Sequence, residues 1–306
     1  MLKFSNLLKY LNSHEGFKRY FANTSWLFAE KIIRLVIGLF VGVWVARYLG
    51  PAKYGLLNYV QAFVGLFSAF ATLGLDGIVV RELVKDENKK DLLLGTAFWL
   101  KVVGAFVMLV MLGVAVQFTS NDHYTNILVF IVAGSTIFQA FNVIDFYFQA
   151  KVLGKFIAMA NSISLFISSI VKIVLILMKA PLIAFAWAVL FDNVALAIGL
   201  VYFYVKNKPS IVTNKMRQFI LWKFNKSTAM SLLRDSWPII LSGIVLMIQA
   251  RIDQVMIQEM VGSTEVGYYS VALRLIESFG FVIVLINNSI FPALVNAKKV
   301  SQKLKR

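Results

Sequence analysis

Cysteine is absent from this chain of 306 residues, and histidine occurs only twice. Without thiols the protein forms no disulfide and no thiolate metal site. Both histidines, His14 and His123, fall outside the long apolar segments of the sequence. Redox and zinc chemistry therefore lack the residues they require, and we expect no metal site, no cofactor and no catalytic residue.

Long apolar segments are abundant: hydrophobic residues make up 59% of the chain, and the mean hydropathy is +0.75. A membrane-spanning helix needs about 20 predominantly apolar residues, and eight segments reach that length. They are Ala22–Tyr48, Tyr54–Leu75, Leu92–Val116, Thr125–Phe148, Phe156–Met178, Leu182–Val205, Ser236–Val261 and Tyr268–Val295. We therefore expect an all-α polytopic membrane helix bundle with about eight transmembrane helices.

Acidic residues are scarce, 15 against 31 basic ones, which gives a net charge of +16. Twenty-two of the basic residues lie in alternate connections between the predicted spans, and only Arg47, Lys53 and Lys179 lie in the opposite set. Basic connections stay in the cytoplasm, so both termini are predicted to be cytoplasmic. The excess positive charge follows from this topology, and no nucleic-acid partner is needed to explain it.

The sequence repeats itself, with an offset of 212 residues at the glycines of two turns. Ser25-Trp26 opens the first span and Ser236-Trp237 the seventh, and the outer turns Gly50–Gly55 and Gly262–Gly267 carry glycines in matching places. A parallel repeat of this kind predicts two six-helix lobes. Only two spans of the second lobe are present before Arg306, so we expect an interrupted or truncated reading frame.

These observations divide the chain into five predicted regions. They are an interfacial amphipathic segment (1–21), a first six-helix lobe (22–205), a cytoplasmic amphipathic linker (206–235), the two-helix start of a second lobe (236–295) and a basic cytoplasmic tail (296–306). Regions 1–21 and 206–235 both contain lysine mixed with apolar residues at helical spacing. This pattern predicts that each forms a helix lying on the inner leaflet.

Two motifs resemble a known family. The run Trp44–Tyr59, with its Leu-Gly-Pro-x-x-Tyr-Gly turn after a charged first span, and the run Ala71–Leu83 are similar to the N-terminal part of Wzx-type oligosaccharide flippases of the MATE-like superfamily. The resemblance covers essentially the whole chain. It implies a MATE-like first lobe, and transfer of undecaprenyl-diphosphate-linked oligosaccharides from the inner to the outer leaflet of a bacterial plasma membrane. It also implies membrane lipids and polysaccharide polymerases as partners.

Charged residues inside the first span indicate where such a ligand binds. A charge near the bilayer centre costs about 2.5 to 3.5 kcal/mol on insertion scales, so Glu30, Lys31 and Arg34 are expected to face a wet cavity. Together with Asn23, Gly38 and Val41 they fall within about a third of the helix surface. Glu30 and Arg34 are four residues apart and can pair, which leaves Lys31 and part of the Arg34 guanidinium for an anionic ligand.

The seventh and eighth spans carry the remaining candidate site residues. Arg251 occupies a place in the second lobe that resembles that of Arg34 in the first, and we predict that a diphosphate binds between them. Arg274 is a further substrate-binding candidate. Glu30, Asp253 and Glu277 are the candidate ion-coupling carboxylates, because a carboxylate in an alternating cavity can load and release a cation.

Other functions remain open at this point. A multidrug or organic-cation exporter of the same architecture would favour an acidic, aromatic cavity, and a truncated chain need not transport at all. A membrane polymerase or ligase needs an extended outer loop, whereas the longest outer connection here is 117–124. No Gly-x-x-x-x-Gly-Lys-Ser/Thr loop for nucleotide hydrolysis occurs. We therefore predict a transporter rather than an enzyme.

Overall fold

The structure is a computed structural model, and it describes residues 15–207 and 223–277, which contain helices and no strand. The α-helices are α2 (Glu15–Leu66), α3 (Ser68–Thr72), α4 (Asp76–Lys85), α5 (Lys90–Ala115), α6 (His123–Gly134), α7 (Val143–Ala150), α8 (Gly154–Leu177), α9 (Leu182–Lys206) and α11 (Lys226–Met260). The short 3-10 helices are η1 (Glu87–Lys89), η2 (Val116–Phe118) and η3 (Ser135–Asn142). A further helix covers 263–277 and is called helix 263–277 below.

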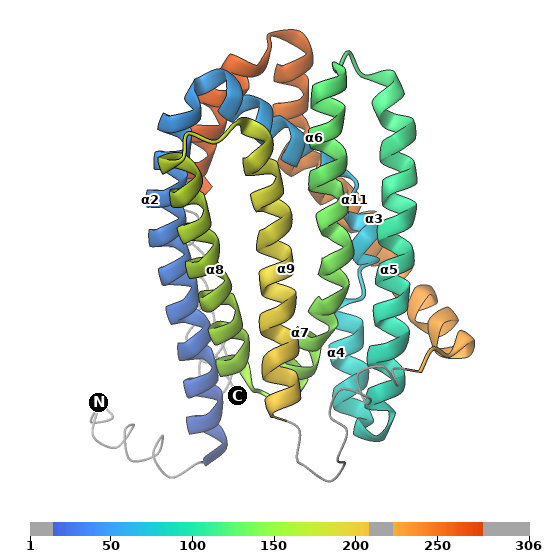
Figure 1. Ribbon diagram of the computed structural model, residues 1–306. Coiled ribbons are helices and arrows are strands. Elements are labelled where there is room, and N and C mark those ends of the chain that lie inside the picture. The colour runs from blue at the N-terminus through green and yellow to red at the C-terminus, as the bar shows by residue number, and fades with distance from the viewer. Residues whose placement is uncertain (1–14, 208–222, 278–306) are drawn as a thin grey trace, which may run out of the picture.

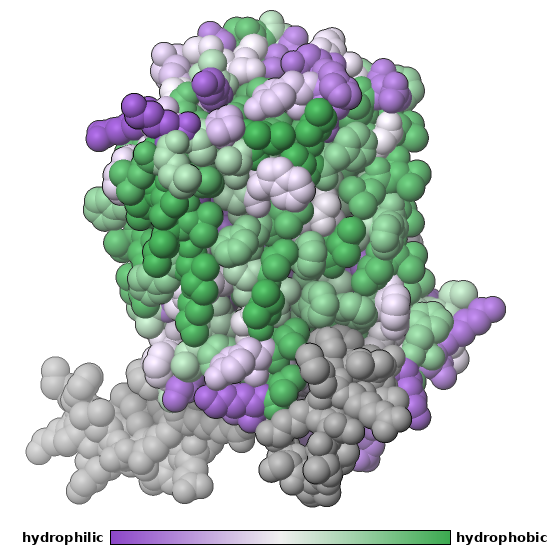
Figure 2. All heavy atoms as spheres, in the orientation of Figure 1, coloured by the Kyte–Doolittle hydropathy of each residue, from purple (hydrophilic) through white to green (hydrophobic). Residues whose placement is uncertain are grey.

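The long helices form an upright bundle, in which α8 and α9 lie side by side and α2 packs against α8 (Figure 1). Within the described residues, six helical segments are long and apolar enough to cross a membrane. Apolar side chains cover the middle of the visible face, and hydrophilic ones gather toward its two ends (Figure 2). The predicted all-α polytopic membrane bundle is therefore confirmed.

The first predicted span and most of the second form one element, α2, which bends at Gly50 and ends at Leu66. The rest of the second predicted span, up to Leu75, lies in α3 and the turn that follows it. Gly50 has a φ of 71°, outside the helical region, and Pro51 starts the second part of α2. Glycine adopts positive φ without the strain that a side chain would cause, and proline suits the first turn of a helix. The Gly-Pro pair therefore turns the chain between two spans without an intervening loop.

The two repeated outer turns pack directly on each other. A Cβ added to Gly55 would lie 1.7 Å from the carbonyl oxygen of Ser263, and one added to Gly267 would lie 2.2 Å from that of Pro51. At the offset of 212 residues, Gly55 corresponds to Gly267 and Pro51 to Ser263. The contact, called the turn contact below, is thus reciprocal under the repeat. It holds the bend of α2 against helix 263–277.

The fourth predicted span is helical throughout, but its middle is not an α-helix. It begins as α6, tightens into η3 and ends as α7. Ser135 and Thr136 at this change donate hydrogen bonds of 2.7 Å to the carbonyls of Val132 and Ala133. Such hydroxyl bonds to the preceding turn satisfy polar side chains within the apolar layer.

The predicted amphipathic linker is continuous with the seventh span where the structure describes it. α11 begins at Lys226, with the Asn225 side chain accepting a hydrogen bond from the amide of Thr228, and it runs through Pro238 to Met260. The start of α2 likewise includes part of the predicted interfacial segment. Residues 1–14, 208–222 and 278–306 lie outside the described residues, and the predicted domain division remains a prediction.

Candidate functional site

A cavity of about 490 Å³ lies between α2, α8, α9 and helix 263–277. We call it the cationic cavity. Its charged and polar lining residues are Lys31, Arg34, Tyr54, Asn58, Gln61, Ser169, Lys172, Asp192, Arg274 and Glu277. Leucine, valine, glycine and phenylalanine complete the wall. Four cations and two carboxylates line it, so the cavity carries an excess of positive charge and favours anions.

Arg34 is held by the predicted pair with Glu30. The guanidinium Nε donates a hydrogen bond of 2.7 Å to Oε1 of Glu30, and Nη2 lies 2.7 Å from the same oxygen in the ion pair. The Glu30 side chain is only 2% exposed, whereas that of Arg34 is 45% exposed. Glu30 therefore faces the protein, whereas Arg34 faces the cavity. The ion pair with Glu30 holds the Arg34 guanidinium in place, and the edge of the guanidinium that faces the cavity stays accessible to a ligand.

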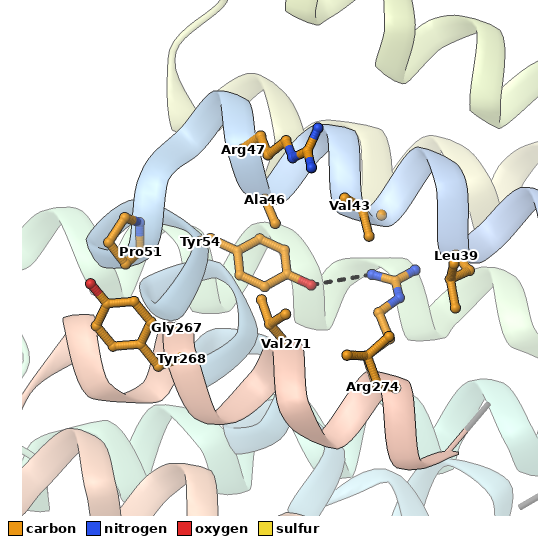
Figure 3. Close-up of a pocket in the computed structure, with 12 residues that line it drawn as sticks. Leu39, Val43, Ala46, Arg47, Pro51, Tyr54, Gly267, Tyr268, Val271 and Arg274 are labelled. Atoms are coloured by element: carbon orange, nitrogen blue, oxygen red, sulfur yellow. Dashed lines mark hydrogen bonds between the residues drawn. The ribbon is translucent and has the colours of Figure 1, made fainter. Parts of the chain in front are cut away.

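Arg274 reaches across from helix 263–277 to α2. Its Nη2 donates to the carbonyl of Gly38 at 3.0 Å, and its Nη1 donates to the Tyr54 hydroxyl at 3.3 Å (Figure 3). A Cβ on Gly42 would lie 2.4 Å from the guanidinium carbon. The absence of a side chain at Gly42 thus makes room for the arginine against the first helix.

A third charged group joins α8 and α9. Lys172 Nζ lies 2.6 Å from Asp192 Oδ2 and 3.0 Å from the Ser168 hydroxyl. Ser168 also donates to Asp192 Oδ1, and Ser164 donates to the Asp192 carbonyl at 3.3 Å. Both ends of the ion pair line the cationic cavity. The sequence placed Lys172 at membrane depth, but the pairing with Asp192 requires the packing of two helices.

Neither predicted site residue of the seventh helix, Arg251 or Asp253, lines the cavity. Arg251 Nη1 is 3.9 Å from Glu277 Oε1, and Glu277 itself lines the cavity. Asp253 accepts a hydrogen bond of 2.9 Å from the Tyr269 hydroxyl. The structure therefore brings Lys31, Arg34, Arg274 and Glu277 together, with Arg251 one contact removed.

Asn23 differs from the expectation that it lines the cavity with the other polar residues of the first helix. Its side-chain oxygen accepts a hydrogen bond from the amide of Gly154, the first residue of α8. The first amides of a helix have no partner within it, so an asparagine from another helix satisfies one of them here. This role depends on a contact 131 residues away in the sequence, which helical periodicity does not reveal.

Neutral polar residues of the cavity were not singled out from the sequence either. Tyr54, Asn58 and Gln61 lie in the second part of α2, and all three line the cavity. Residues 54, 58 and 61 share one helix face by their spacing. That spacing is the signal that could have found them. In residues 15–207 and 223–277, no group of three or more metal-ligating side chains occurs.

The comparison with protein families matches residues 20–298 to the family described as polysaccharide biosynthesis protein. The chain belongs to this family. No curated protein and no solved structure matches it. The match spans both predicted lobes and all cavity residues, so this family member is a multi-spanning membrane protein connected with polysaccharide biosynthesis. It agrees with the general family resemblance in the motifs.

Proposed function

We propose that the protein transfers polyprenyl-diphosphate-linked oligosaccharides, with undecaprenyl as the carrier, from the inner to the outer leaflet of a bacterial plasma membrane. The observation that carries the proposal is the cationic cavity at membrane depth in a member of a polysaccharide biosynthesis family. A diphosphate presents several anionic oxygens, which guanidinium and ammonium groups bind where water is scarce.

The headgroup would lie near Lys31 and Arg34, with Arg274 on the opposite wall. Neutral donors and acceptors on α2, Asn58 and Gln61 among them, are the kind of partner that sugar hydroxyls require. Arg251 would act through Glu277, whose carboxylate it approaches to 3.9 Å. An organic-cation exporter would need the opposite charge balance in this cavity, so the excess of basic groups argues against it.

The coupling carboxylates are part of the same proposal. Glu277 lines the cavity beside Arg251, Glu30 is held by Arg34, and Asp253 bonds to Tyr269. An anionic ligand that attracts Arg34 or Arg251 would release the paired carboxylate, which could then take up a cation. Glu277→Gln should therefore remove cation dependence of transport while the protein still binds diphosphate.

Binding of inorganic pyrophosphate to the purified 306-residue chain in lipid nanodiscs tests the headgroup site. Lys31→Ala leaves the Glu30–Arg34 pair in place and should weaken binding by about tenfold, because one charge-assisted contact is lost. Arg34→Ala should weaken it at least as much. Arg234→Ala, on an exposed part of α11 outside the cavity, is the matched control and should bind normally.

The same substitutions made at the chromosomal locus test transfer itself. Lys31→Ala and Arg34→Ala should reduce surface glycan, with lipid-linked oligosaccharide accumulating on the inner leaflet and the protein level unchanged. Normal binding and normal glycan display in both variants would contradict the proposal.

A further inference from the structure

A second cavity, of about 360 Å³, adjoins the cationic cavity on the outer side of Arg274. We call it the apolar groove. One wall comes from α2 with Leu39, Val43 and Ala46, and the other from helix 263–277 with Val271 and Leu275 (Figure 3). Its volume lies in the range of small-molecule sites, about 300 to 1,000 Å³. Its walls are mostly aliphatic, which excludes a sugar or a phosphate as the main occupant.

The two cavities meet at Arg274. Leu39, Gly42, Tyr54 and Arg274 line both of them. The Arg274 guanidinium bonds to Gly38 and Tyr54 at this boundary, while an arginine stem is itself apolar and can line a groove. A molecule with an anionic head and an apolar chain would thus place its head against the charge of Arg274. Its chain would lie against the aliphatic side chains of the groove.

Exposure of the groove residues indicates where the chain enters. On helix 263–277, the groove residues Tyr268, Val271 and Leu275 are 65%, 36% and 43% exposed. At the outer end, Tyr54 is buried and the turn contact at Gly267 closes the space between the helices. The groove is therefore open along its side and closed at its outer end.

We infer that the apolar groove holds the first isoprene units of the carrier whose diphosphate lies in the cationic cavity. The inference rests on the proposed function and deepens it, because it assigns a place to the part of the ligand next to the head. A chain that leaves lipid for the groove exchanges one apolar environment for another. The groove consequently fixes the position of the chain, and hence of the diphosphate, more than it raises affinity.

Photo-crosslinking tests this position directly. The probe is farnesyl diphosphate with a diazirine on its isoprenoid chain, bound to the 306-residue chain in nanodiscs, and adducts are located by mass spectrometry. We expect adducts on the groove side chains of α2 and helix 263–277. Leu275→Trp fills the groove and should lower these adducts by about fivefold or more, because a packed site admits no chain. Ile276→Trp, at the adjacent 68% exposed position outside the groove, should leave them unchanged.

Ala46→Trp narrows the groove from the α2 wall and is the second filling variant. It should also lower the adducts, so the inference can be tested even where Leu275→Trp does not fold. Unchanged adducts in a folded filling variant, or adducts spread over lipid-facing residues such as Val103, would overturn the inference. Equal labelling by a phospholipid with a diazirine in its acyl chain would overturn the assignment to an isoprenoid. Inorganic pyrophosphate binding, measured alongside, separates these results from failure of the headgroup site, since groove filling should not change it.

Discussion

Three charged residues within the predicted spans, Arg34, Lys101 and Lys172, pair with carboxylates. Arg34 pairs with Glu30 on its own helix, whereas Lys172 pairs with Asp192 on the next one and Lys101 with Asp76 at 3.0 Å. Pairing lowers the cost of holding a charge away from water, and removing one partner leaves the other uncompensated. The local pairs are visible in the sequence, but the pairs between helices depend on the fold.

The Lys172–Asp192 pair should show strong energetic coupling. Lys172→Met or Asp192→Asn alone should lower the apparent melting temperature in detergent, because each leaves one half-buried charge without its partner. The double variant should lose less than the sum of the two. We expect a coupling energy of about 1 kcal/mol. Thermal melts of the four proteins measure it, and strictly additive losses would show that the pair contributes nothing beyond its separate side chains.

An exposed pair between η1 and the turn before α8 predicts a pH dependence. The hydrogen bond from Lys151 lowers the pKa of Glu87 below its usual 4.5. A lowered pKa in the folded state means that the pair stabilises the protein fully above pH 4.5 and is lost as pH falls through the folded value. Glu87→Gln should therefore melt earlier than the wild type at neutral pH, and the difference should shrink as the pH falls below 4.5 and Glu87 becomes protonated. Melting curves between pH 3.5 and 7.5 give the comparison.

Asp86→Asn serves as a control for that experiment, because Asp86 caps η1 and pairs with Lys89 of the same short helix rather than with another element. Its substitution should not loosen the contact with residue 151. A melting difference for Glu87→Gln that persists unchanged at pH 3.5 would mean that the charge of Glu87 is not what stabilises this end of the molecule.

Site residues were predictable from the sequence to the extent that single helices position them. The polar stripe of the first helix contains Lys31 and Arg34, which line the cavity, and the Glu30–Arg34 pair follows from the spacing of those two residues alone. Asp192 was not among the predicted site residues, because its pairing with Lys172 requires α8 to lie beside α9. Asn23 was misplaced for the same reason, since its partner is the start of α8.

At the scale of elements, the outer turns connect the repeat to the packing. Gly55 and Gly267 have no side chain because the opposite turn's backbone occupies that space. Positive φ values at Gly50 and Gly262, 71° and 121°, start both turns. The repeat in sequence is therefore matched by a reciprocal contact in space, which is what two parallel lobes would give.

The turn contact predicts an unusually large effect of a single methyl group. Gly55→Ala should lower the apparent melting temperature by several degrees, since its Cβ would overlap the backbone of Ser263 and backbone cannot move aside as a side chain can. Gly77→Ala is the matched control: nothing lies within 4 Å of its Cβ position, and alanine favours a helix. Thermal melts of both variants in detergent decide the point, and equal stability would mean that the outer turns can separate freely.

Helix boundaries followed from hydropathy within a few residues for most spans. The predicted span Phe156–Met178 is α8, Gly154–Leu177, and the span Leu182–Val205 is α9, Leu182–Lys206. Hydropathy reports burial in lipid and carries no information about backbone type, so it did not reveal η3 within the fourth span. It also did not show that α11 extends ten residues ahead of Ser236.

On the scale of the whole molecule, the apolar belt fixes how the bundle crosses a membrane but not which end faces the cytoplasm. Figure 2 shows hydrophilic side chains at both ends. The basic connections break this symmetry, because α4 and η1 carry Arg81, Lys85 and Lys89 while the outer turn of α2 carries Lys53 alone. Basic residues resist transfer across the membrane, so the α4 end should be cytoplasmic.

Single-cysteine labelling tests this orientation without background, because the natural chain has no cysteine. Lys53→Cys in the outer turn should react with a membrane-impermeant maleimide in intact spheroplasts. Lys85→Cys, whose wild-type side chain is 60% exposed in a surface ion pair, should react only after permeabilisation, and loss of such a pair costs little. Labelling of the Lys85→Cys variant in intact spheroplasts would mean that the α4 end faces outward and the turn contact faces the cytoplasm. Diphosphate carriers made in the cytoplasm would then approach the cationic cavity from the end that the turn contact closes.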